Sequence, residues 1–290
     1  TVPEKPDSAD ADKLTKYNFE EKQIYYYLKN SQGQDAADKW LTVMQSTAEK
    51  RYNDDRETAY LNFAKEYDIA VIGAGHAGIE AALACARLGA KTVIFTINMD
   101  AVGNCPCNPS IGGTAKGHLV REIDALGGMM GRVADRSAIQ FRMLNRSKGA
   151  AMWSPRAQCD KELFSRLWRR ELENTPNLYI WQDAATELLF EEGAEGTMPR
   201  ITGVRTRMGV EFKARAVVLT AGTFLGGLMH CGERNAEGGR AGDAASHGIT
   251  EALVKRGFEV GRMKTGTPAR IDARSVDFSV MEIQEGAAEP

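Results

Sequence analysis

The chain has 290 residues, of which 43% are hydrophobic and 26% are charged, a composition typical of soluble globular proteins. Its formal net charge of −2 does not indicate a nucleic-acid-binding protein, so any RNA contact is expected to come from local basic clusters. No run of about 18 apolar residues occurs, which excludes a membrane-spanning helix. Residues 1–12 do not have the pattern of a secretory signal, and five scattered cysteines favour a reducing, cytoplasmic compartment.

Residues 1–66 form the first region, which contains more acidic than basic residues. Gly33 interrupts a helical pattern, and Trp40, Leu41 and Met44 then fall at the spacing of an amphipathic helix. We predict a helical extension here, and its role is unknown because no residue in it suggests chemistry.

The second region, residues 67–290, opens with a short apolar strand at residues 69–72. A glycine-rich turn follows at residues 73–78 and leads into an alanine-rich helix that Gly89 ends. A second buried strand is predicted at residues 92–96. Strand, turn, helix and strand together form a βαβ unit, in which the two strands are parallel and the crossover is right-handed.

The glycine-rich turn predicts a dinucleotide site. Gly73 permits the tight turn, Gly75 lets a pyrophosphate approach bare backbone, and Gly78 lets the helix pack closely on the strand. The N-terminus of the helix favours an anion because its first N–H groups are free. We assign cofactor binding to the six residues of the turn: Gly73, Ala74, Gly75, His76, Ala77 and Gly78.

The end of the second strand lacks the acidic residue that usually binds the ribose. Thr96 or Asn98 could form a weaker hydrogen bond with a ribose, and Asp100 comes slightly late in the sequence. The ribose contact therefore has no clear source.

The order of the later elements favours FAD over NAD. A helical and loop stretch is predicted at residues 117–174, followed by a strand at 178–181 and an antiparallel hairpin at 200–212. A buried strand at 216–219 then ends in a second turn, formed by Thr220, Ala221 and Gly222. Such an inserted hairpin is common in flavoproteins of the two-dinucleotide type, whereas a plain dehydrogenase would continue with βα units. We predict an α/β, Rossmann-like FAD-binding fold with an inserted β-meander, preceded by a helical N-terminal segment.

Seven motifs of the second region point to one known family. They lie at residues 104–113, 116–128, 139–145, 147–149, 155–158, 238–243 and 264–268. They resemble those of the tRNA uridine 5-carboxymethylaminomethyl modification enzymes, also called the glucose-inhibited division protein A family. The similarity runs from residue 67 to about residue 279, and residues 1–66 have no counterpart in it.

The resemblance implies an FAD-dependent enzyme that takes reducing equivalents from NADH. It implies that a carbon from methylenetetrahydrofolate builds an aminomethyl group on C5 of a tRNA wobble uridine. It also implies a homodimer that works with a GTPase partner.

The resemblance also implies site residues. Cys107 matches a family cysteine, and its thiolate could add to C6 of the uracil ring, whereas a buried and unreactive cysteine is the alternative. Cys105 has no family counterpart, and a single Cys-x-Cys pair gives no reason to expect a metal site. By the same alignment Ala185 touches the adenine end of FAD through its backbone. Ser246 is expected near FAD, where it could also cap the helix that follows.

Two basic clusters are candidates for phosphate contacts, with ordinary surface charge as the alternative. The first contains Arg142, Arg146, Lys148 and Arg156, and the second contains Arg262, Lys264, Arg270 and Arg274.

The second cysteine motif of the family, and its helices for tRNA and the GTPase partner, would lie beyond Pro290. We therefore interpret the chain as a truncated N-terminal half that is inactive alone in tRNA modification. Other functions stay open: a folate- and FAD-dependent tRNA uridine methyltransferase, a generic flavoprotein, or a non-catalytic FAD-binding fragment.

Overall fold

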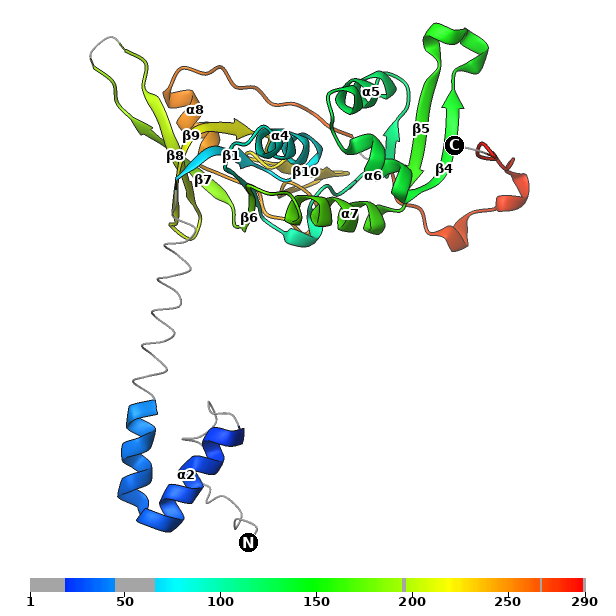
Figure 1. Cartoon of the computed structure of the whole chain (residues 1–290). Coiled ribbons are helices and arrows are strands. Elements are labelled where there is room, and N and C mark those ends of the chain that lie inside the picture. Colours follow the sequence, from blue (N-terminus) through cyan, green and yellow to red (C-terminus); the bar gives the residue numbers. More distant parts are fainter. Residues whose placement is uncertain (1–18, 45–65, 195–196, 267, 289–290) are drawn as a thin grey trace. The chain divides into compact units, whose positions relative to one another are not determined.

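Figure 1 shows the computed structural model of the chain, which describes residues 19–44, 66–194, 197–266 and 268–288. The chain divides into two units, Thr1–Phe63 and Ala64–Pro290. In the part that the structure describes, no helix is long and apolar enough to cross a membrane.

The first unit contains two helical segments that meet at Gly33. Helix α2 spans Phe19–Gln32, residues 34–44 are also helical, and Gly33 between them has a left-handed φ of +92°. Three side chains form a small buried core: Tyr25, Ala37 and Leu41. The predicted helical N-terminal segment is confirmed for these residues, whereas residues 1–18 and 45–65 lie outside the described part.

The second unit is built on one six-stranded sheet. In spatial order its strands are β6 (Leu178–Gln182), β2 (Thr92–Thr96), β1 (Tyr67–Ile72), β9 (Glu211–Leu219), β8 (Arg200–Thr206) and β7 (Ala185–Glu191). The first four strands are parallel, and the last three form an antiparallel meander that shares β9 with them. This arrangement confirms the predicted α/β class with its parallel sheet and inserted meander.

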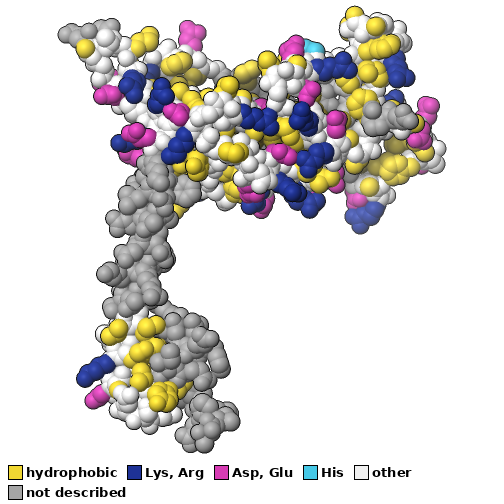
Figure 2. Space-filling view, viewed as in Figure 1, with side chains coloured by type: hydrophobic (Ala, Val, Ile, Leu, Met, Phe, Trp, Pro, Cys, Tyr) yellow, Lys and Arg dark blue, Asp and Glu magenta, His cyan; other side chains and the backbone are white. Residues whose placement is uncertain are grey.

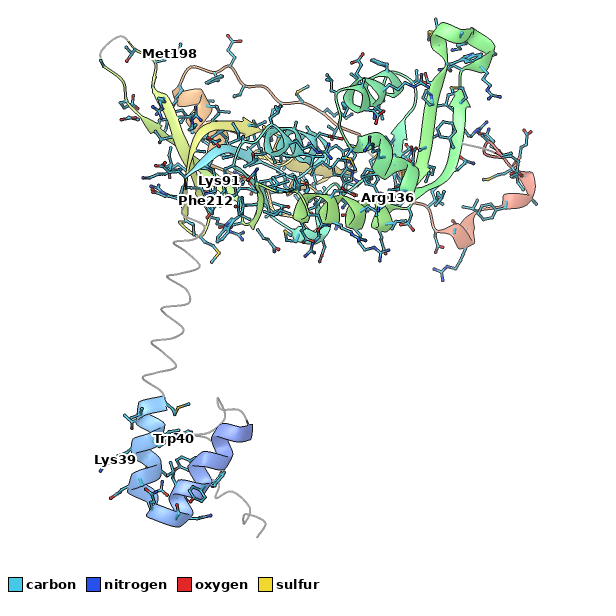
Figure 3. The ribbon with its side chains drawn as sticks, in the orientation of Figure 1. Lys39, Trp40, Lys91, Arg136, Met198 and Phe212 are labelled. Atoms are coloured by element: carbon cyan, nitrogen blue, oxygen red, sulfur yellow. The ribbon has the colours of Figure 1, made fainter. Side chains whose placement is uncertain are left out.

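The parallel part of the sheet is covered on both faces. All five residues of β2 are buried, as expected for a parallel strand with layers on either side. Helices α4 (His76–Arg87) and α7 (Lys161–Glu173) pack with Ile94 on one face. On the other face the ring of Phe212, labelled in Figure 3, lies 5.0 Å from the ring of Phe95. The meander therefore supplies the second layer.

Strand β9 is longer than the sequence predicted. The hairpin at 200–212 and the strand at 216–219 were expected as separate elements, but the structure has one nine-residue strand, Glu211–Leu219. Its first residues pair antiparallel with β8, and Ala214–Leu219 pair in parallel with β1. A single strand thus carries the chain from the meander to the end of β1.

The predicted helical and loop stretch at residues 117–174 is wrong in its middle. Helices α5 (Gly117–Ala125) and α6 (Met130–Ser137) are followed by two strands, β4 (Ala138–Leu144) and β5 (Ser154–Cys159). These strands form a small antiparallel sheet with β3 (Ser110–Gly112) in the order β3-β5-β4. Figure 1 shows β4 and β5 as a long hairpin beside α5 and α6. The alternation that marks a strand is weak here because a small residue, Ala157, occupies the inward position at the centre of β5.

Short elements complete the second unit. They are the 3₁₀ helices η1 (Met99–Ala101), η2 (Arg146–Lys148), η3 (Ala150–Met152), η4 (Ala273–Ser275) and η5 (Phe278–Val280), strands β10 (Leu228–Cys231) and β11 (Arg234–Glu237), and helix α8 (Ile249–Lys255).

Helix α4 approaches β1 and β9 so closely that only glycine fits at one position. A Cβ atom on Gly78 would lie 1.8 Å from the carbonyl oxygen of Gly73 and 2.6 Å from Oγ1 of Thr220. By contrast, apart from its chain neighbours, no described heavy atom lies within 4 Å of the position that a Cβ on Gly75 would take. Gly78 therefore serves the packing of the fold, whereas Gly75 faces open space.

We predict that Gly78→Ala lowers the free energy of unfolding by about 3 kcal/mol or more, because the added methyl group forces α4 away from the sheet. Gly75→Ala should change it by no more than about 1 kcal/mol. Denaturant unfolding of both variants and the parent chain, followed by circular dichroism, measures this difference. Equal destabilisation by the two substitutions would contradict the packing argument.

Candidate functional site

The candidate site lies where the four parallel strands end. Strand β1 leads into residues 73–78, β2 into residues 96–98, β6 into residues 183–185 and β9 into residues 220–222. In open α/β sheets, ligands bind in the crevice outside the carboxyl ends of the strands. The structure thus brings the two predicted turns to one edge of the sheet.

The two turns are joined by hydrogen bonds of Thr220. Its hydroxyl group donates in a three-centre bond to the carbonyl oxygens of Ile72, at 2.9 Å, and Gly73, at 3.0 Å. Its backbone N–H also donates to the carbonyl of Ile72, at 2.9 Å. Gly73 itself has a left-handed φ of +102°, and its N–H donates to the carbonyl of Phe95 at 3.0 Å. The start of α4 is therefore fixed between β2 and β9.

The N-terminus of α4 has the features of an anion site. Gly75 is the N-cap residue of this helix, and no described side chain accepts a hydrogen bond at the cap. A Cβ atom on Gly75 would project into open space, and the free N–H groups and dipole of the first turn favour a negative charge there. We call this open space at the N-terminus of α4 the cradle, and its features suit a dinucleotide pyrophosphate.

The three residues considered for the ribose contact are engaged with one another. Thr96 donates through its hydroxyl to the carbonyl of Asn98 at 2.9 Å, and the side chain of Asn98 accepts from the N–H of Asp100 at 2.9 Å. The Asp100 carboxylate pairs with Arg169 at 3.2 Å. These side chains shape the turn between β2 and η1.

Ser246 and Ala185 are in contact. The Ser246 hydroxyl donates to the carbonyl of Ala185 at 3.3 Å, and the Ser246 backbone N–H donates to the carbonyl of Phe224 at 2.7 Å. These bonds link the chain after the second turn to the start of β7. Ser246 does not cap the next helix, so that prediction is wrong. The N-cap of α8 is Gly248, whose left-handed φ of +98° permits a late start and whose N–H donates to the Glu251 carboxylate at 2.7 Å.

His76 connects the glycine-rich turn to the loop that contains the Cys-x-Cys pair. Its Nε2 lies 3.1 Å from the carbonyl oxygen of Gly103 and 3.5 Å from Sγ of Cys105, while the N–H of Gly103 donates to the carbonyl of Ala74 at 2.8 Å. Burial lowers the pKa of His76 below its ordinary value, so the ring is neutral at neutral pH. The ring of His76 also packs edge-on against that of Phe164, with the two ring centroids 5.8 Å apart.

The two cysteines of the pair lie in different environments. Cys105 is buried, and burial raises its thiol pKa to about 11, with nearby Cys159 adding to the effect. Cys107 is only partly buried, and its Sγ lies 4.0 Å from the carbonyl oxygen of Gly266. Cys107 is therefore the thiol of the pair that a reagent or substrate can reach. The described residues contain no group of three or more His, Cys, Asp and Glu side chains that could hold a metal ion.

Two residues of the first basic cluster lie on one face of the small sheet. Arg142 and Arg156 are cross-strand partners on β4 and β5, with Arg156 also opposite Gly112. Arg142 bonds to the Gln284 side chain and Arg156 to the Gln158 side chain, and neither has an acidic partner among the described residues. Two like charges directly opposite each other repel, so this pair favours an anionic ligand.

The three arginines of the second cluster all form hydrogen bonds or ion pairs within the chain. Arg262 donates to the carbonyl of Gly226 at 2.6 Å, and Arg274 pairs with Asp272 at 2.6 Å. Arg270 donates to the carbonyl oxygens of Pro106 and Cys107. Figure 2 shows basic side chains interspersed with acidic ones over the visible face of the second unit, in agreement with the small net charge.

Comparison with known proteins gives consistent matches. A profile of the family described as glucose inhibited division protein A matches residues 68–290. The tRNA uridine 5-carboxymethylaminomethyl modification enzyme MnmG of Bacteroides thetaiotaomicron is 58% identical over 221 residues, which cover 76% of this chain and 34% of that protein. MnmG of Flavobacterium johnsoniae is 56% identical over 228 residues, which cover 79% of this chain and 36% of that protein. The form I crystal structure of Aquifex aeolicus GidA matches with a TM-score of 0.73 and 49% identity, over 78% of this chain and 37% of that one.

We predict that iodoacetamide labels Cys107 and exposed Cys231 in the folded chain near neutral pH, while Cys105 and Cys159 stay unlabelled. Burial hides the latter two thiols and raises their pKa values, which lowers the reactive thiolate fraction. Peptide mass mapping after a short exposure measures the labelling, with denatured chain as the control for complete reaction. Labelling of Cys105 as fast as that of Cys107 would show that the loop is not held as described.

Proposed function

Because the chain belongs to the glucose-inhibited division protein A family, we propose that it forms the FAD-binding part of an enzyme that modifies the wobble uridine of tRNA. The relatives are named tRNA uridine 5-carboxymethylaminomethyl modification enzymes, and the chain spans about a third of their length. The complete reaction is thus proposed for a protein of the full family length that contains this sequence. The observation that carries the proposal is the open cradle over Gly75 at the N-terminus of α4.

In this proposal FAD lies along the carboxyl edge of the parallel strands. The backbone of residues 73–78 holds the pyrophosphate at the N-terminus of α4. Ala185 contacts the adenine end through its backbone, with Ser246 beside it. Residues 220–222 lie on the other side of the glycine-rich turn, to which the Thr220 hydroxyl donates hydrogen bonds at the carbonyl oxygens of Ile72 and Gly73. When bound, FAD supplies redox chemistry, with NADH as the reductant and methylenetetrahydrofolate as the carbon donor.

Cys107 is the proposed nucleophile. Its thiolate adds to C6 of the uracil ring, so that an S–C6 bond forms while the C5=C6 double bond opens. The electron pair moves to C5 and is delocalised onto the O4 carbonyl, which makes C5 able to attack a one-carbon electrophile. Loss of the C5 proton and departure of the thiolate then restore the double bond. The partial exposure of Cys107 supports this role, whereas the buried thiol of Cys105 does not suit it.

The anionic substrate is proposed to contact the first basic cluster. The cross-strand pair of Arg142 and Arg156, with Arg146 and Lys148 near the tip of the same hairpin, offers positive charge to RNA phosphates. The hairpin also reaches the reactive loop, because Gln158 donates to the side chain of Asn108 at 3.3 Å. A GTPase partner, a homodimer and a cytoplasmic location complete the proposal by family membership.

We predict that Gly75→Val removes bound FAD, because its side chain would fill the space that the pyrophosphate needs. The visible absorbance of the purified chain measures flavin content. Gly261→Val controls for the general effect of a valine at an open glycine, since apart from its chain neighbours no described heavy atom lies within 4 Å of its Cβ position. Full flavin content in the Gly75 variant, with normal folding, would refute this position for the cofactor.

In a protein of the full family length, Cys107→Ser should abolish uridine modification and leave FAD bound. Cys105→Ser should retain most of the activity because its thiol is buried and does not reach substrate. Mass analysis of wobble uridines in tRNA measures the product. Equal loss in the two variants would contradict the assignment, and a methylated rather than aminomethylated uridine would favour the methyltransferase alternative.

A further inference from the structure

The loop that contains Cys107 is held from a distant part of the chain. Nη2 of Arg270 donates to the carbonyl oxygen of Pro106 at 2.6 Å and to that of Cys107 at 3.1 Å. Gly266, four residues earlier in the same segment, places its carbonyl oxygen 4.0 Å from Sγ of Cys107. One segment therefore contacts both the backbone and the thiol of this residue.

The loop needs such support because it has little regular structure of its own. It runs from the end of η1 at Ala101 to the start of β3 at Ser110. Its first half is fixed to the glycine-rich turn, where the N–H of Gly103 donates to the carbonyl of Ala74 and His76 contacts Cys105. Its second half, which contains Cys107, is held at its carbonyl oxygens by Arg270.

Arg270 differs from its neighbours in the second basic cluster. The guanidinium of Arg262 binds the carbonyl of Gly226, and that of Arg274 binds the carboxylate of Asp272. The three arginines look equivalent in the sequence, but in the structure only Arg270 of these three contacts the loop with the thiol. Its guanidinium keeps its positive charge at neutral pH, so it also places a cation beside Cys107.

We propose that Arg270 is a positioning residue for Cys107: it fixes the backbone of the reactive loop and gives the thiol a positive neighbour. The proposal rests on the proposed function, in which Cys107 is the nucleophile. A charged donor to a carbonyl makes a stronger hydrogen bond than a neutral one, which suits it to hold an irregular loop. A cation beside the thiol also favours the approach of anionic reactants.

The test compares two alkylating reagents of similar size on the 290-residue chain. The rate of Cys107 labelling by anionic iodoacetate is divided by its rate with neutral iodoacetamide, each followed by peptide mass mapping. In Arg270→Gln this ratio should fall by a factor of about two to five, because two nearby unit charges interact by up to about 1 kcal/mol in a water-like medium. Amide hydrogen exchange in residues 104–109 should become faster because the loop loses its clamp. Arg270→Lys should restore the ratio, since an ammonium keeps the charge and can donate to both oxygens.

Arg262→Gln is the matched control, because it removes the same group from the same segment without touching the Cys107 loop. It should leave the reagent ratio and the exchange of residues 104–109 unchanged. An unchanged ratio and unchanged exchange in Arg270→Gln would overturn the proposal, as would equal changes in the Arg262 variant. Neither readout requires turnover, so they are independent of the proposed function. If a Cys107→Ser variant of the full-length protein still modified uridine, Cys107 would not be the nucleophile. The reagent ratio and the exchange rates would still show whether Arg270 positions the loop.

Discussion

The arrangement of helix α4 on the sheet of the second unit depends on the close contact among Gly73, Gly78 and Thr220. No side chain fits at Gly78, so α4 lies directly against the turn after β1. Thr220 then bonds the end of β9 to the same turn. This contact decides where the N-terminus of α4 points, and therefore where an anion would be held. It also fixes Ala74, whose carbonyl accepts from Gly103 and thereby attaches the cysteine loop to the same turn.

Because the loop is attached to the glycine-rich turn in this way, Cys105 and Cys107 differ in exposure and therefore in reactivity. The loop enters the core at Cys105, beside the half-buried ring of His76, and leaves it again at Cys107. From there β3 passes into the small sheet. The inward faces of its strands pack with the core, and its other face has Arg142 opposite Arg156. Three features therefore lie in succession: the turn at Gly75, the accessible thiol of Cys107, and the arginine pair of the small sheet, which has no acidic partner among the described residues. That order is compatible with the proposed function.

The sequence was sufficient for the elements with strong local signals. Strand β2 and the start and end of α4 follow from a buried apolar run and from glycines at the turn and after the helix. It was insufficient where partners far along the chain decide the structure. Strands β4 and β5 were missed because Ala157 gives a weak inward signal, and the late start of α8 depends on the left-handed Gly248. The roles of His76 and Arg270 depend on partners 27 and 164 residues away, respectively, which no local pattern reveals.

We propose that the carboxyl edge of the parallel strands forms one dinucleotide site. The decisive measurement is amide hydrogen exchange of the purified chain, stripped of flavin and then measured with and without added FAD. If FAD binds at this edge, exchange should slow in residues 73–79, 96–104 and 220–226, which are connected by hydrogen bonds. Protection confined to the opposite edge, around the hollow lined by Asp68, Arg200 and Arg215, would contradict it.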